Sequence, residues 1–248
     1  MLNPAEMNKF HALAADTIAI NQMVGNNNNP GVETFRHQME IIASEFEELE
    51  DGFNLDNRTE LRDGLADVFF TVGALYGRMH WPLPNVLPEP CHGEDPAALV
   101  TWIGRQMSAL KVLSTLSFGS MFYDARKITF YVARQITDQI MTNCVVLGKA
   151  LKIDLLADWE AVNTSNWTKF DSDSETAART VKKYEDKGIA VYQTMVGRDD
   201  GKTFFVTFSL KEQFDEKGRA MPANKWLKSI NFVDVDFSEP TTAGDMAG

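Results

Sequence analysis

The chain has 248 residues, of which 44% are hydrophobic and 24% are charged, and these globular values exclude wholesale disorder. Its 24 Lys and Arg residues against 35 Asp and Glu residues give a net charge of −11, which excludes general binding of duplex nucleic acid and favours cations as partners. Two cysteines are too few for a disulfide framework, and without a long apolar run we expect no signal peptide and no membrane partner, hence a cytoplasmic protein.

The first half of the chain is predicted to be helical. Residues 4–23 form a first helix, which the breaker run GNNNNPG ends. Hydrophobic residues then recur with spacing 4-3-4-3-4 in two successive segments, which is typical of helices that pack along a seam. The first seam contains Phe35, Met39, Ile42, Phe46, Leu49 and Phe53, and the second contains Leu61, Leu65, Val68, Val72, Leu75 and Met79. Because only a few residues connect them, with Asp56 or Asn57 as a cap, the two helices should be antiparallel neighbours.

The second half changes in character. A proline-rich connector at 81–96 precedes two further helical stretches, 97–117 and 121–152, which complete a set of four helices. Residues 189–210 then alternate β-favouring side chains around the turn RDDG and predict a hairpin.

These elements predict a mainly α protein, with an antiparallel four-helix bundle core and a small C-terminal β-hairpin extension. We expect a helical catalytic domain over residues 1–171 and a β-containing extension over residues 172–240 that packs on it as a flap. Residues 241–248, which are small and mostly polar, are expected to form a disordered tail.

Acidic residues concentrate where the two seams lie. Ten of the 35 acids fall between residues 40 and 67, against two arginines, and most of them fit a solvated helix face. Glu45, Glu48 and Asp67 each directly precede a seam residue, and Asp63 lies four residues before Asp67 on the same face. On antiparallel helices these four carboxylates would converge along one edge of the seam.

Four converging carboxylates repel one another strongly when they are partly buried. Because no Lys or Arg on either helix has the same phase, a divalent cation is the simplest counter-charge. Ligation by oxygen alone selects Mg²⁺, with Mn²⁺ as a possible substitute, over zinc.

The same residues resemble a known family. SEFEELEDGF followed by ELRDGLADVFFTVGALYG is similar to the all-α nucleotide pyrophosphohydrolases, the MazG-like and phosphoribosyl-ATP pyrophosphohydrolase-like group. Their pattern is EExxE on one helix and ExxD on the next. Glu45, Glu48 and Asp67 match it, whereas Ser44 stands at the first Glu and Gly64 at the Glu of ExxD, with Asp63 one residue earlier as its substitute. NTSNWTKFD at 163–171 and NKWLKSINFVDVDF at 224–237 resemble segments of phage-type members.

The resemblance implies a four-helix core of this all-α NTP pyrophosphatase type and a Mg²⁺-dependent cleavage of the α–β phosphoanhydride of a (deoxy)nucleoside triphosphate. The products would be a nucleoside monophosphate and pyrophosphate. It also implies a homodimer or homotetramer, in the host cytoplasm if the protein is phage-encoded.

The resemblance also implies roles for particular residues. Four carboxylates would bind the metal: Glu45, Glu48, Asp63 and Asp67. Glu45 would also be the general base. Four further residues would contact ribose or phosphate: Asn166, Lys169, Lys225 and Lys228. The net charge of +4 over residues 179–228 supports the last two.

Two alternatives stay open. The chain could be a non-catalytic helical interaction protein whose acidic edge binds a basic partner, because Ser44 and Gly64 depart from the family pattern. A carboxylate-bridged di-iron bundle is the third reading. Glu89 and His92 have suitable spacing for it, but Pro88 and Pro90 prevent the helix that this spacing requires.

Overall fold

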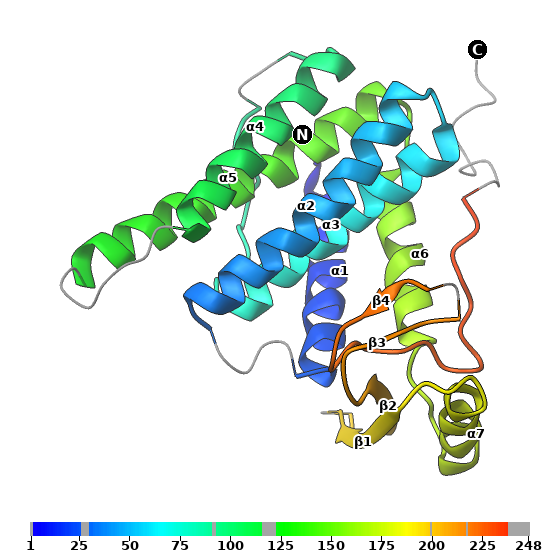
Figure 1. Cartoon of the computed structure of the whole chain (residues 1–248). Helices are drawn as coiled ribbons and strands as arrows, with labels where there is room; N and C mark the ends of the chain where they lie inside the picture. Colours follow the sequence, from blue (N-terminus) through cyan, green and yellow to red (C-terminus); the bar gives the residue numbers. More distant parts are fainter. Residues whose placement is uncertain are drawn as a thin grey trace.

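The computed structural model describes residues 2–25, 30–90, 93–115, 123–198, 200–216 and 218–237, and in this part of the chain the mainly α prediction is confirmed (Figure 1). The helices are α1 (Pro4–Met23), α2 (Val32–Asn54), α3 (Arg58–Met79), α4 (Pro96–Thr115), α5 (Tyr123–Ala150), α6 (Leu155–Trp167) and α7 (Ser174–Glu185). The strands are β1 (Val191–Gly197), β2 (Thr203–Ser209), β3 (Gln213–Phe214) and β4 (Ala220–Met221).

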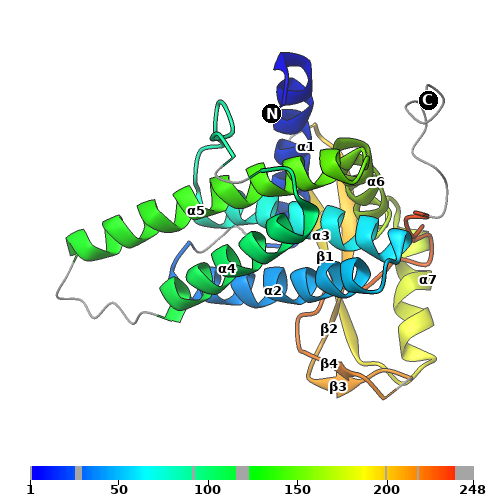
Figure 2. The ribbon, with the colours of Figure 1, turned by 90° about the horizontal axis from the view of Figure 1, so that it is seen from above.

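Helices α2 and α3 lie antiparallel, and their two seams form the centre of the core. Every seam residue is buried except Phe53, which is half-buried. Asn57 caps α3 by accepting a hydrogen bond from the Glu60 backbone N–H, as expected for one of the two candidate caps. Helices α4 and α5 pack beside this pair and extend away from the strands (Figure 2).

The predicted set of four helices is incomplete, because α1 and α6 also pack on α3. Trp159 of α6 contacts Phe69 of α3 edge-to-face, with ring centroids 4.7 Å apart, and also contacts Phe10 of α1 at 5.7 Å. Helix α6 was not predicted as a helix of its own. Asp154 begins it by accepting a hydrogen bond from the Ala157 N–H at 3.1 Å. Helix α3 therefore has neighbours on both sides.

The predicted hairpin is confirmed as β1 and β2, which pair antiparallel from Val191 opposite Ser209 to Gly197 opposite Thr203. Gly201 in the connecting turn has φ +81°, the left-handed region that favours glycine. The short strands β3 and β4 form a second antiparallel pair, which was not predicted. Val206 and Phe208 of β2 pack with Ile20 and Met23 at the end of α1, so the strands lie against the helical core.

No helix within the described ranges is long and apolar enough to cross a membrane. The tail predicted over residues 241–248 lies outside the described residues.

Candidate metal and phosphate site

Two glycines determine how closely α2 and α3 approach. A Cβ at Gly52 would stand 2.7 Å from the Leu61 nitrogen, and a Cβ at Gly64 would stand 2.6 Å from the Leu49 nitrogen. The backbones therefore touch at two points of one antiparallel register. In this register Glu45 lies near the level of Asp67.

The carboxylates of this edge interact electrostatically. The pKa of Glu45 is raised from an ordinary 4.5 to about 7, first by burial and then by the charges of Glu48 and Asp63. Burial also raises the pKa of Asp67 from 3.8 to about 8, with added repulsion from Glu45 and Asp63. The pKa of Asp63 is raised by its burial and by the charge of Glu48. The charge of Glu48 thus contributes to the raised pKa values of Glu45, Asp63 and Asp67.

Lys169 is a counter-charge that the two helices do not supply. It follows α6 in the chain, and its positive charge lowers the pKa of both Glu45 and Asp67. Its own pKa is lowered to about 8, first by burial and then by the nearby charge of Lys228. The fold thus brings this cation to α2 and α3 from a distant segment of the chain.

Polar contacts hold Lys169 in place. Its ammonium donates a hydrogen bond to the Asn166 Oδ1 at 2.5 Å and lies 5.0 Å from the Trp226 ring centroid. Asn166 is buried at the end of α6, so its side chain faces the lysine rather than open solvent. Asn166 and Lys169, both predicted to contact the substrate, are therefore in direct contact with each other.

The carboxylates do not form a closed set of ligands in this structure. Among the residues with a described placement, no three His, Cys, Asp or Glu side chains lie close enough together to hold a metal ion. The donor chemistry nonetheless fits, because several partly buried carboxylates that repel one another are what Mg²⁺ or Mn²⁺ would neutralise.

Lys169 also lines a cavity of about 380 Å³, whose wall contains six cationic side chains. We call it the basic cavity; its cations are Lys169, Lys183, Lys187, Arg219, Lys225 and Lys228. Three of these are paired: Lys187 with Glu216 at 2.6 Å, Arg219 with Asp215 at 2.7 Å, and Lys228 with Asp234 at 3.4 Å. The cavity thus has more positive than negative charge, as an anion site requires.

A buried aspartate holds the segment that carries Lys228 beside Lys169. The Asp171 carboxylate accepts hydrogen bonds from Ser229 at 2.5 Å and from Thr180 of α7 at 3.1 Å. The Thr180 hydroxyl in turn accepts a hydrogen bond from the Ile230 N–H at 3.1 Å. This network joins the residue-229 segment to α7 and to the chain just after Lys169.

Three of the four predicted substrate residues therefore line one cavity: Lys169, Lys225 and Lys228. The fourth, Asn166, binds one of them. Sequence reasoning missed Lys183, Lys187 and Arg219, although the positive charge of the 179–228 segment signalled them.

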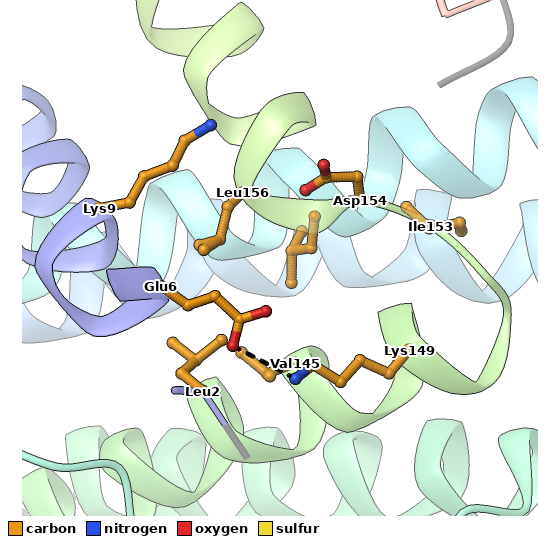
Figure 3. Close-up of a pocket in the computed structure, with 9 residues that line it drawn as sticks. Leu2, Glu6, Lys9, Val145, Lys149, Ile153, Asp154 and Leu156 are labelled. Carbon is orange, nitrogen blue, oxygen red and sulfur yellow. Dashed lines mark hydrogen bonds and ion pairs between the residues drawn. The ribbon is translucent and has the colours of Figure 1, made fainter. Parts of the chain in front are cut away.

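Another cavity, of about 300 Å³, lies between the beginnings of α1 and α6 and the end of α5 (Figure 3). Its polar groups have structural partners: Lys149 pairs with Glu6 at 3.5 Å, Lys9 pairs with Glu160 at 2.7 Å, and Asp154 caps α6. It shares no lining residue with the basic cavity or the carboxylate edge. We assign it no function.

Comparisons of the chain with protein-family models, with curated proteins and with solved structures find no match.

Proposed function

We propose that this protein is a Mg²⁺-dependent (deoxy)nucleoside triphosphate pyrophosphohydrolase. One observation carries the proposal: Lys169 lines the basic cavity and also interacts electrostatically with the partly buried carboxylates Glu45 and Asp67. A triphosphate with its divalent cation needs this pair of neighbouring environments, since the cation requires anionic oxygen ligands and the phosphates require cationic donors.

Glu45, Glu48, Asp63 and Asp67 would hold the cation, and Mn²⁺ could replace Mg²⁺. When bound, the metal would neutralise charge on the phosphoryl oxygens and lower the pKa of the attacking water. Lys169, Lys225 and Lys228 would bind phosphoryl oxygens from the basic cavity. Asn166 would keep the Lys169 ammonium in position.

Glu45 is suited to accept the proton of the attacking water, because its pKa of about 7 lies near neutral pH. The water oxygen bonds to the α-phosphorus while the bond from that phosphorus to the α–β bridging oxygen breaks. The bridging oxygen leaves with pyrophosphate and takes the bonding electron pair. The nucleoside monophosphate remains.

Incubation of the purified protein with canonical and modified dNTPs and Mg²⁺, followed by anion-exchange separation of the products, tests the proposal. We expect nucleoside monophosphate and pyrophosphate in equal amounts. Release of orthophosphate with a diphosphate, or no turnover of any nucleotide with either Mg²⁺ or Mn²⁺, would overturn it. Without turnover, the alternative of an acidic edge that binds a basic partner would be favoured.

The expected homodimer or homotetramer stays a prediction. Light scattering coupled to size-exclusion chromatography measures it directly.

A further inference from the structure

A larger cavity of about 690 Å³ shares two lining residues, Lys225 and Trp226, with the basic cavity. Glu45 of the carboxylate edge contributes to its wall, together with Arg78 of α3 and Phe208 of β2. We call it the Arg78 cavity. Its volume lies in the range of small-molecule sites. A ligand whose phosphates occupy the basic cavity could therefore extend past the carboxylates into this second space.

Arg78 is a buried cation for which the described part of the chain offers no partner. Its side chain lines the cavity, the residue is 6% exposed, and no hydrogen bond or ion pair to its guanidinium is found among the described residues. The Nε atom is buried without an acceptor. Burial alone lowers its pKa to about 10. Burying a guanidinium without hydrogen-bond acceptors costs folding free energy. A ligand that accepts hydrogen bonds from Arg78 would offset this cost.

Arg62, on the same helix, is equally buried but has a hydrogen-bond partner. It is 7% exposed, nearly the same as Arg78, but it donates two hydrogen bonds to the Asp158 carboxylate at 3.0 and 2.7 Å. Arg62 thus has the bidentate partner that a buried arginine normally has. In the Arg78 cavity the acids Glu40 and Glu45 form no ion pair with Arg78, and Glu40 lies 3.8 Å from His37 instead.

The wall opposite α2 is aromatic. The Trp226 indole Nε1 is a second buried donor without an acceptor, and the Trp226 ring packs 4.8 Å from the Phe170 ring. Phe208 is held by stacking on Tyr192 at 5.3 Å. Flat aromatic surfaces beside unpaired N–H donors suit a flat heterocycle with acceptor atoms on its edge.

We propose that the Arg78 cavity binds the base of the nucleotide, with the Arg78 guanidinium donating two hydrogen bonds to a base edge that carries two adjacent acceptors. Guanine offers O6 and N7, and cytosine offers O2 and N3. Adenine and thymine alternate donors and acceptors along their edges, so they would leave one guanidinium N–H unpaired. This inference rests on the proposed function and adds base preference to it.

The experiment compares the wild-type protein with Arg78→Met and Arg78→Lys. Equilibrium binding of dGMP, dCMP, dAMP and dTMP is measured by calorimetry without metal, and kcat/KM is measured for the four dNTPs with Mg²⁺. We expect the wild type to prefer the guanine and cytosine nucleotides by about tenfold or more. Both variants should lose this preference and bind all four nucleotides equally weakly. Arg78→Lys keeps the positive charge, so its result does not depend on whether the Met variant folds.

Thermal unfolding separates ligand binding from a structural role. Because Arg78 has no partner to lose within the described ranges, Arg78→Met should keep or raise the Tm, whereas Arg62→Met should lower it. Unchanged base preference in both Arg78 variants would overturn the inference and leave the proposed function standing. A lowered Tm of Arg78→Met, together with an equal loss of affinity for all four nucleotides, would also overturn the inference, because it would indicate a structural role for Arg78. Selective, Arg78-dependent binding without hydrolysis would instead uphold the inference and overturn the proposed function.

Discussion

Gly64 of α3 lies against the backbone of Leu49 of α2, so closely that a Cβ at Gly64 would stand 2.6 Å from the Leu49 nitrogen and 2.7 Å from its Cα. The resembled family pattern has Glu at this position, but here the helix crossing leaves no room for a side chain. Asp63, one residue earlier, faces the edge where it interacts with Glu48 and Asp67. The departure from the pattern thus has a steric reason.

Gly64→Ala should destabilise the protein by about 1–3 kcal/mol, because backbone atoms cannot move aside as a flexible side chain can. Urea unfolding followed by circular dichroism measures the change. Gly31→Ala is the matched control, since nothing lies within 4 Å of a Cβ there. A Gly64 variant as stable as this control would show that the helices separate easily.

Glu48→Gln and Asp67→Asn should each lower kcat by at least about 100-fold while the helical circular dichroism signal stays unchanged, because each removes a charged oxygen ligand from the proposed cation site. Steady-state hydrolysis of the preferred dNTP provides the measurement. Glu47→Gln, an exposed neighbour on α2 outside the four-carboxylate set, is the control and should keep activity. Retained activity in both test variants would refute the metal site.

The stability of the metal-free protein should depend on pH in a definite direction. Glu45 and Asp67 ordinarily ionise with pKa values of 4.5 and 3.8, but in the fold their pKa values rise to about 7 and about 8. The folded chain therefore holds these protons more tightly than the unfolded chain. The resulting stability is fully present below the ordinary values and is lost as the pH rises through the raised ones.

Thermal unfolding in EDTA should accordingly show a Tm that falls between pH 5 and pH 8. Asp67→Asn cannot ionise at this position, so its Tm should fall less over the same range, and added Mg²⁺ should restore the wild-type Tm near pH 8. Parallel curves for the two proteins would contradict the raised pKa of Asp67.

Lys169→Met should shift the acidic limb of the kcat profile to higher pH. The positive charge of Lys169 lowers the pKa of Glu45 and Asp67, so its removal raises both. Lys182→Met, an exposed lysine of α7 that pairs with Asp186, is the control and should leave the profile in place. An unmoved limb in Lys169→Met would mean that Lys169 does not influence the titrating group.

Arg62→Met should cost about 3–5 kcal/mol of stability, because it leaves the buried Asp158 carboxylate without its partner. Arg36→Met, which removes an exposed pair with Glu33, should cost less than about 1 kcal/mol. Urea unfolding at neutral pH gives both values. Equal costs would show that the Arg62–Asp158 pair contributes no more than a surface pair.

Much of the helical core could be predicted, because hydrophobic spacing directly reports the buried face of a helix. The two seams, which begin at Phe35 and Leu61, lie on α2 and α3 as predicted. The raised pKa values of Glu45 and Asp67 show that acids beside seam residues are partly buried. The strands β3 and β4 are only two residues long, which is too short for any alternation to be recognised. The buried face of helix α6 includes polar residues such as Asp158, Asn163 and Asn166, so its sequence lacks the purely apolar periodicity by which a helix is recognised.

The partners of charged groups could not be predicted from spacing. Lys169 lies more than a hundred residues from Glu45 in the chain, and only the fold brings them together. Arg62 and Arg78 look alike in sequence, on the same helix, yet one has an acid opposite and the other does not. Which arginine is paired depends on where α6 and the C-terminal segment pack, and no local pattern contains that information.

Lys225 and Trp226 line both cavities, and this has a consequence for the order of synthesis. The carboxylates leave the ribosome within the first third of the chain, whereas Lys225 and Trp226, which the two cavities share, follow much later. A nascent chain would therefore display its acidic edge for most of translation without a place for a nucleotide. Under the proposed function, a nucleotide could bind only after the segment around Lys225 and Trp226 has been synthesised and has packed on the helices.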